Sequence, residues 1–144
     1  MKLTYEKNKE ILKKYFENWE KKDIEGIKNS LSEDYLAYNY PIMIPKGDTI
    51  WTKDQLIKSI KNDAFQQIDV EFGHTIFLPG VDTLNLELDG SVRVYSAQSF
   101  TVNGEKLELS IYGTYDFRND SIYQSHEFYD IGGLSQQVDK LFIE

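Results

Sequence analysis

The stretch GTYDFRNDSIYQSHEFYD, from Gly113 to Asp130, decides the fold because it contains two strands and the turn that joins them. Its centre, Asn119-Asp120, is a two-residue turn of the kind that closes β-hairpins. Asn103-Gly104 is a second such turn, one strand length upstream. The part of the chain after Asp89-Gly90 therefore predicts three antiparallel strands joined by two tight turns.

Before this meander the hydrophobic pattern is helical. Asp23 is a candidate N-cap for a short second helix, and Thr52 with Gln55 forms a capping box at the start of a third. Between these helices, YLAYNYP predicts a strand that Pro41 stops. The first helix has a single apolar stripe formed by Ile11, Leu12, Tyr15, Phe16 and Trp19.

From Ile68 onward the hydrophobic period changes to two. Alternate apolar residues and His74 then share one face of a long strand, which we expect to end at Pro79-Gly80. Leu84–Leu88 is ambiguous and is a candidate for a further short strand. At the end of the sequence, GGLSQQVDKLF predicts a closing helix. Helices followed by a strand meander predict one α+β domain over residues 1–144, with the helices packed on one face of the sheet.

Composition excludes several classes of partner and site. The formal charge of −8 repels phosphate backbones, so we expect neither nucleic acid nor an anionic membrane as a partner. The absence of cysteine rules out disulfides, thiolate metal sites and a cysteine nucleophile. The start, MKLTYEKNKE, is charged without an apolar segment behind it, and no run approaches the ~20 apolar residues of a membrane span. We therefore expect a cytoplasmic protein without a signal peptide.

The two turns also predict which side chains share a face of the sheet, because directly paired residues lie on the same face. Counting back from Asn119-Asp120 pairs Gly113 with His126. Phe128 and Asp130 then lie on the same apolar face as His126. The Asn103-Gly104 turn adds the pairs Gln98–Leu109, Ser96–Ile111 and Val94–Gly113.

Polar side chains on the helix-covered, apolar face predict a pocket, since burying a polar group is costly unless it is paired or solvated. These side chains are Gln98, His126, Asp130 and, on the neighbouring strand face, His74. The opposite face presents the polar-tipped aromatic residues Tyr95, Tyr112 and Tyr129, together with Ser110 and Glu127. A slip of one residue in either hairpin would exchange the two faces.

The sequence resembles the superfamily of nuclear-transport-factor-2-like (NTF2-like), SnoaL-like and ketosteroid-isomerase-like domains over nearly its whole length. Three segments carry the resemblance: ILKKYFENWEKKDIEGIKNSLSEDYLAYNYP, TKDQLIKSI and GTYDFRNDSIYQSHEFYDIGGLSQQV. It implies a strongly curved, mostly antiparallel sheet with the N-terminal helices in its concave face, a short C-terminal helix and a deep pocket. It further implies a small apolar or amphipathic molecule in this cone, and a homodimer through the convex sheet face that would hold Tyr95, Tyr112 and Tyr129.

Within this resemblance, Tyr15 falls at the oxyanion-donor tyrosine of the steroid isomerases. Asn39 falls at the position of their base, and Gly113 falls near that of their second acid. Neither residue can accept a proton near neutral pH, so we do not expect steroid isomerisation. For Tyr15 we favour a packed core tyrosine over a catalytic one.

The SnoaL-like cyclases are similar in another way, because they carry an acid/base aspartate in the last strand, where Asp130 lies. The alternative is that Asp130 ends the strand and caps the closing helix beside Gly132-Gly133. His126 is a polar pocket group, a proton shuttle or a core histidine with one hydrogen bond. It cannot contact Asp130, because four residues of regular strand separate the two by roughly 13 Å. The spacing of the histidines supports no metal site, and we expect neither a metal nor a cofactor.

Two functions remain open. The first is a small-molecule enzyme, polyketide-cyclase-like or isomerase-like, in which Asp130 is the acid/base and His126 assists it. The second is a ligand-binding or protein-interaction module with the same pocket and no turnover. The enzyme requires Asp130 to point into a closed cavity, whereas an Asp130 that caps the last helix in solvent would remove its base. In both cases the expected pocket lining is Tyr15, Asn39, His74, Gln98, Ile111, Gly113 and Phe128.

Overall fold

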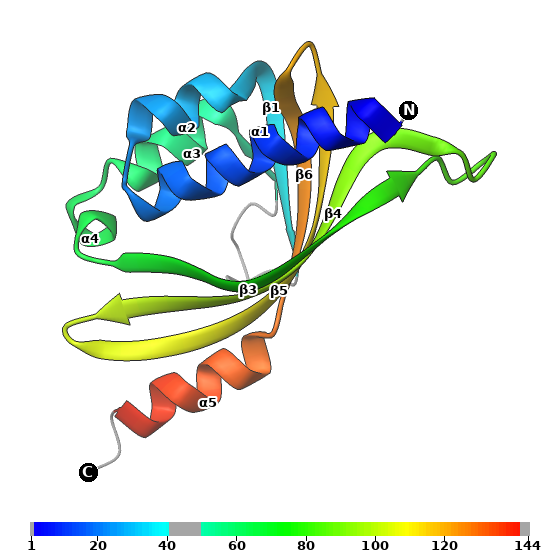
Figure 1. Ribbon diagram of the computed structural model, residues 1–144. Coiled ribbons are helices and arrows are strands. Elements are labelled where there is room, and N and C mark those ends of the chain that lie inside the picture. Colours follow the sequence, from blue (N-terminus) through cyan, green and yellow to red (C-terminus); the bar gives the residue numbers. More distant parts are fainter. Residues whose placement is uncertain (1, 41–49, 142–144) are drawn as a thin grey trace.

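The computed structural model describes residues 2–40 and 50–141, which form five helices and six strands (Figure 1). Most helices come first and the long strands follow, as the change in hydrophobic period predicts. In chain order the elements are α1 (Lys2–Glu20), α2 (Ile24–Ser30), β1 (Leu31–Tyr40), β2 (Ile50–Thr52), α3 (Lys53–Ile60), α4 (Asp63–Gln66), β3 (Asp69–Val81), β4 (Leu88–Val102), β5 (Glu105–Arg118), β6 (Ser121–Tyr129) and α5 (Ile131–Leu141).

The six strands form one sheet in the order β2-β1-β6-β5-β4-β3. All neighbouring strands are antiparallel except β1 and β6, which are parallel. The sheet is strongly curved, with α1, α2 and α3 inside the curve and α5 against its outer side (Figure 1). The predicted α+β architecture, with the N-terminal helices in the concave face, is confirmed.

Helix α1 packs its apolar stripe into the concave face. Leu12, Tyr15 and Phe16 are buried, and the ring of Phe16 stacks on that of Phe72 in β3 with centroids 4.4 Å apart. The other side of α1 is covered with Lys and Glu, as in the exposed pair Lys13–Glu10. No helix within the described ranges is long and apolar enough to cross a membrane.

Hydrogen bonds confirm the predicted helix starts. Oδ1 of Asp23 accepts from the backbone N–H of Gly26 at 2.9 Å and so caps α2. Thr52 and Gln55 form the reciprocal capping box at the start of α3. The strand predicted between them is β1, and Pro41, its expected end, lies outside the described residues.

Both predicted two-residue turns are present. Asn103 and Gly104 (φ 51° and 83°) join β4 to β5, and Asn119 and Asp120 (φ 51° and 62°) join β5 to β6. Positive φ at both central residues is the type I′ geometry, whose twist matches that of a hairpin. The β4–β5 register is the predicted one, with the pairs Gln98–Leu109, Ser96–Ile111 and Val94–Gly113.

The predicted β5–β6 register is wrong beyond the turn. Phe117 pairs with Ile122 as expected, but Tyr123 is then an extra, bulged residue. Gly113 therefore pairs with Glu127 instead of His126. Since neighbours along a strand point to opposite faces, one extra residue reverses the faces of the rest of β6. The inward set becomes Ser125, Glu127 and Tyr129, and the outward set becomes Gln124, His126 and Phe128.

A second bulge has the same effect in β3. Between the paired residues Phe72 and Thr75, β3 holds one residue more than β4. The alternation predicted from Ile68 is therefore broken after Gly73. The residues beyond the break that were predicted to face inward are exposed: His74, Ile76 and Leu78.

The connection from β3 to β4 also differs from the prediction. Strand β3 continues past its expected end at Pro79-Gly80 and stops at Val81. Oδ1 of Asp82 then accepts from the backbone N–H groups of Leu84 at 2.8 Å and Asn85 at 3.2 Å. An aspartate that bonds the backbone two or three residues on closes a turn. The candidate strand at Leu84–Leu88 is therefore this turn, and β4 begins where it ends.

Candidate active site

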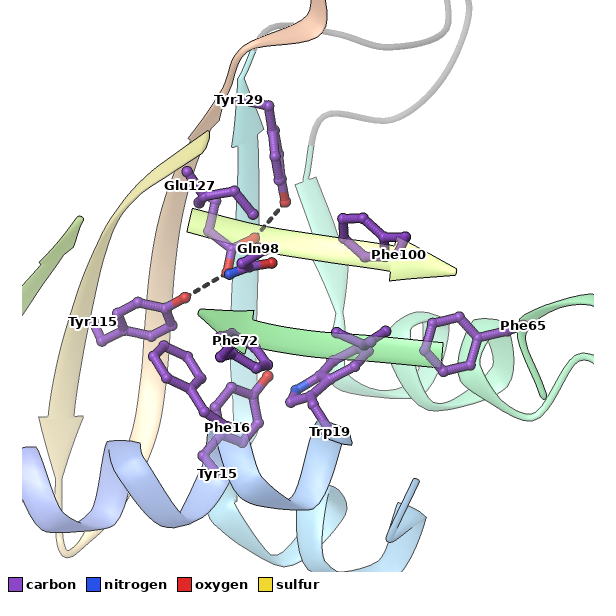
Figure 2. A pocket seen from close by; sticks show the side chains of 12 residues that line it. Tyr15, Phe16, Trp19, Phe65, Phe72, Gln98, Phe100, Tyr115, Glu127 and Tyr129 are labelled. Atoms are coloured by element: carbon purple, nitrogen blue, oxygen red, sulfur yellow. Dashed lines mark hydrogen bonds between the residues drawn. The ribbon is translucent and has the colours of Figure 1, made fainter. Parts of the chain in front are cut away.

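The concave face encloses a cavity of about 160 Å³ between the helices and the sheet (Figure 2). Helices α1 and α4 and the four long strands β3 to β6 all contribute to its wall, so residues far apart in the sequence meet there. Eight of the twelve lining side chains are aromatic and one is charged. The lining residues are Tyr15, Phe16, Trp19, Phe65, Val70, Phe72, Gln98, Phe100, Ile111, Tyr115, Glu127 and Tyr129.

Two tyrosines hold the carboxylate of Glu127. The Tyr115 hydroxyl donates to Oε1 at 2.6 Å, and the Tyr129 hydroxyl donates to Oε2. Figure 2 shows both hydroxyls directed at the carboxylate from opposite sides. Hydrogen bonds to an ionised acceptor are stronger than neutral ones, so this pair of phenols fixes the orientation of Glu127.

Asn39 supports this network from β1. The Tyr129 hydroxyl lies 3.0 Å from Oδ1 of Asn39, so its single proton has two acceptors. The carboxylate of Glu127 is the stronger of the two because it is charged. Asn39 thus positions the Tyr129 hydroxyl without acting as a base, and it stands beside the cavity rather than in its wall.

Burial keeps the tyrosines around Glu127 protonated. It raises the pKa of Tyr115 and of Tyr129 well above the ordinary value for a phenol, and the negative charge of Glu127 raises both further. The pKa of Tyr15 is also raised, mainly by burial and then by Tyr35 and Glu127. The cavity therefore combines neutral phenols with one carboxylate.

A second buried hydroxyl pair lies next to this network. The Tyr35 hydroxyl of β1 and the Ser125 hydroxyl of β6 are 2.7 Å apart, and both side chains are almost fully buried. Burial raises the pKa of Tyr35, with a further contribution from the charge of Glu127. Because Ser125 and Glu127 are two residues apart on β6, this pair helps to keep Glu127 on the inner face.

Some residues predicted to line a pocket do lie in the cavity wall. Tyr15 and Gln98 line it together with Ile111, and Figure 2 shows the amide of Gln98 among the aromatic rings. Gly113 faces the same side, where it pairs with Glu127. A Cβ atom at Gly113 would lie 2.9 Å from the ring of Tyr115, so the missing side chain makes room for that ring.

The prediction that His126, Phe128 and His74 face the pocket is wrong, because the two bulges turn them to the outer face of the sheet. The ring of His126 stacks on Tyr38 with centroids 4.5 Å apart. Its Nε2 lies 2.8 Å from the amide nitrogen of Gln124. Because an amide nitrogen can only donate, Nε2 is the acceptor in this contact.

Asp130 caps helix α5. Its Oδ1 accepts from the backbone N–H of Gly133 at 2.9 Å, and its carbonyl oxygen accepts from that of Leu134 at 3.1 Å. The side chain is exposed. This is the capping alternative that the sequence left open, so the enzyme hypothesis loses Asp130 as its base. Glu127 is the carboxylate that the cavity contains instead.

An aromatic row covers the outer face of the sheet. Tyr95 and Tyr112 lie there as expected, with ring centroids 4.8 Å apart. Tyr129, expected beside them, is directed into the cavity by the bulge in β6. Phe128 takes its place, with its ring 5.8 Å from that of Tyr112 and 4.9 Å from that of Tyr40.

Sequence reasoning missed Glu127, which it assigned to the outer face. No local pattern identifies Tyr123 as the bulged residue that turns Glu127 inward, whereas Gly73 inside a strand pattern is a recognised sign of a bulge. Within residues 2–40 and 50–141, no three or more His, Asp or Glu side chains are grouped so that they could hold a metal ion.

Solved structures share this architecture at low sequence identity. A candidate isomerase from Bacillus subtilis superposes with a TM-score of 0.77 at 16% identity, covering 94% of this chain and 95% of that one. A LEH-like epoxide hydrolase from M. tuberculosis superposes with a TM-score of 0.66 at 11% identity, covering 94% of this chain and 95% of that one. An NTF2-like protein from Burkholderia xenovorans LB400 superposes with a TM-score of 0.67 at 16% identity, covering 92% of this chain and 95% of that one. No family model and no curated protein matches the sequence. The structural similarity shows that the chain has the NTF2-like fold.

Proposed function

We propose that this protein is an acid/base enzyme that moves a proton within a small, mostly apolar molecule, with Glu127 as the base. The observation that supports the proposal best is the Glu127 carboxylate, which is the one charged group among the described lining residues and is oriented by two phenols. A carboxylate held in one orientation inside an apolar site is well positioned to accept a proton from a bound molecule.

The reaction that fits this arrangement is the isomerisation of a carbonyl compound. Glu127 takes a proton from the carbon beside the carbonyl, and the electron pair of the C–H bond moves into the carbonyl group to give an enolate. The hydroxyl of Tyr15 or the amide of Gln98 donates to the enolate oxygen. In a substrate with a C=C bond next to this carbon, the enolate electrons spread over that bond and Glu127 returns the proton to its far carbon. The double bond moves beside the carbonyl group, and the reaction consumes no co-reactant.

The cavity limits the size and the charge of the substrate. Its volume of about 160 Å³ is small beside the hundreds of Å³ of typical ligand pockets. None of the twelve described side chains that line it is basic, so a carboxylate or phosphate would find no counter-charge among them. A candidate isomerase and an epoxide hydrolase have the same fold, which supports small-molecule chemistry for this protein.

The competing function is a binding module without turnover. In that case the network of Tyr115, Glu127 and Tyr129 anchors a ligand and no proton leaves it. The two functions make different predictions for exchange at carbon, because only a base removes a proton from a C–H bond.

Hydrogen–deuterium exchange tests the proposal before the substrate is known. The ketone 4,4-dimethylcyclohexanone has acidic C–H bonds beside its carbonyl, and NMR in D₂O follows their loss. We expect the wild-type protein to accelerate this exchange and Glu127→Gln to lose about 10²–10⁴-fold of the acceleration. Asp130→Asn, which keeps a capping side chain outside the cavity, is the control and should retain it. Equal rates for the wild type and Glu127→Gln would contradict the proposal.

We also propose that the protein acts in the cytoplasm as a homodimer joined through the outer face of the sheet. The exposed rings of Tyr95 and Phe128 and the exposed side chain of Ile76 support this interface, because apolar groups gathered on one face favour association. The lack of cysteine is consistent with a reducing compartment. Light scattering should report a dimer for the wild type and a monomer for Phe128→Glu. A monomeric wild type would exclude the dimer.

A further inference from the structure

We infer that the molecule bound in this cavity carries a positively charged nitrogen, held between the carboxylate of Glu127 and the aromatic wall. The inference rests on the proposed function of the cavity as a small-molecule site, and it goes further by naming the charge of the ligand.

The charge balance of the cavity favours a cation. Glu127 is the one charged side chain among the lining residues that the structure describes, and none of the ion pairs between described residues includes it. A carboxylate that is partly withdrawn from water loses solvation, which two phenols replace only in part. A neutral ligand would bury this carboxylate further without a counter-charge, whereas a cationic ligand supplies one.

The hydrogen bonds around Glu127 point to the same class of ligand. Tyr115 and Tyr129 donate their hydroxyl protons to the carboxylate, so each phenol presents oxygen lone pairs to its other neighbours. An ionised carboxylate accepts about four hydrogen bonds, and these phenols fill two of the positions. This end of the cavity is rich in acceptors and poor in donors, which complements an ammonium N–H or the polarised C–H groups of a quaternary nitrogen.

Aromatic rings form the rest of the binding surface. The ring of Trp19 lies 6.1 Å from that of Tyr15 and 5.7 Å from that of Phe65, nearly perpendicular to both. The three rings thus form a corner rather than a flat stack, and Figure 2 shows them across the cavity from Glu127. A cation over a ring face is attracted by the ring quadrupole, most strongly for tryptophan. A carboxylate on one side and aromatic rings on the other is an arrangement that binds ammonium groups.

A matched pair of ketones separates the effect of charge from that of shape. N,N-Dimethyl-4-oxopiperidinium and 4,4-dimethylcyclohexanone have the same ring, methyl groups and carbonyl, and differ only in a quaternary nitrogen that replaces a quaternary carbon. Calorimetric titration measures the binding of each, and NMR in D₂O measures exchange at carbon in the same samples. We expect the cation to bind at least about tenfold more tightly. Equal affinities, tighter binding of the neutral ketone, or no binding of the cation at millimolar concentration would overturn the inference.

Variants locate the source of the preference. Glu127→Gln keeps the shape of the side chain and removes its charge, so the affinity for the cation should fall about tenfold while that for the neutral ketone changes less than about twofold. Glu105→Gln removes one negative charge from the exposed start of β5 and should change neither affinity. Trp19→Leu tests the rings separately. It should weaken the binding of the cation about threefold more than the binding of the neutral ketone. A preference for the cation that persists in Glu127→Gln would reject the role of the carboxylate.

The two measurements also distinguish this inference from the proposed function. Exchange of the neutral ketone without preferential binding of the cation would support the acid/base function and contradict the inference of a cationic ligand. Preferential binding of the cation without exchange of either ketone would support the cationic ligand and contradict the acid/base function.

Discussion

Gly113 lies directly opposite Glu127 in the β5–β6 ladder. Its missing side chain leaves room for the ring of Tyr115, two residues further along the same face of β5, and the Tyr115 hydroxyl donates to Glu127. The resemblance to steroid isomerases assigns an acid to the neighbourhood of Gly113. In this chain the carboxylate at that place comes from the adjacent strand.

Gly113→Ala is expected to displace the ring of Tyr115, because the new Cβ atom would lie 2.9 Å from a ring carbon. We expect a loss of about 1–3 kcal/mol in the free energy of unfolding, measured with urea, and weaker ligand binding. Gly132→Ala in α5 is the control, since its Cβ would meet no atom closer than 3.8 Å and alanine favours a helix. Wild-type stability and binding in Gly113→Ala would show that the space at Gly113 is not required.

Tyr115→Phe removes one of the two donors to Glu127 and leaves the carboxylate oxygen Oε1 without that partner. We expect the free energy of unfolding to fall by about 1.5–3 kcal/mol, the range for hydrogen bonds to charged groups. Tyr112→Phe on the outer face is the control and should change stability by less than about 0.5 kcal/mol. In a double-mutant cycle, Tyr115→Phe and Glu127→Gln should be less than additive; strictly additive losses would show that the two side chains do not interact.

Stability should decline in alkaline solution because of the buried phenols. The pKa values of Tyr15, Tyr35, Tyr115 and Tyr129 are all raised, first of all by burial. A folded state with raised pKa values keeps protons that the unfolded chain has lost, so stability is complete below the unfolded pKa of about 10 and falls as the pH rises through the folded values. Urea unfolding between neutral and strongly alkaline pH measures the decline. Titration of all ten tyrosines near their ordinary pKa while the protein stays folded would contradict this.

Asp130→Ala should destabilise the attachment of α5 without affecting the cavity. The loss of the bond to the Gly133 backbone N–H removes a helix cap, which is worth about 1 kcal/mol. Asp130→Asn, which keeps an acceptor in place, should be close to the wild type. Hydrogen exchange of the α5 amides measures the effect, and ketone exchange serves as the control because Glu127 is untouched. A large loss of ketone exchange in both variants would show that Asp130 contributes to the reaction.

The sequence predicts those parts of the fold whose signals are local. A capping box, an N-cap aspartate and two asparagine-containing turns each act within a few residues, and all of them are found where they were expected. The β4–β5 register follows from the Asn103-Gly104 turn alone, because no extra residue interrupts that ladder. Gln98 and Ile111 therefore line the cavity where this register placed them, and Tyr15 reaches it from the apolar stripe of α1.

The register of β6 could not be predicted in the same way, because its two faces are equally polar. Each face combines two polar residues with one aromatic residue, so the hydrophobic pattern does not choose between them. The choice is made by contacts with distant strands, such as the buried bond between Tyr35 and Ser125 and the bond from Tyr115 to Glu127. In the structure the inward set is Ser125, Glu127 and Tyr129, and the outward set is Gln124, His126 and Phe128.

Deletion of Tyr123 tests the bulge directly. In the structure Asp116 already pairs with Gln124, so removing the extra residue leaves every later pair of the ladder unchanged and keeps Glu127 inside. We expect a folded protein with the ketone exchange and cation binding of the wild type, less stable by about 1–3 kcal/mol because Tyr123 also packs against Arg118. Insertion of an alanine after Tyr123 is the matched control, since a second extra residue must either enlarge the bulge or turn Glu127 outward. If the deletion abolished binding while the insertion preserved it, Glu127 would not face the cavity in the register described.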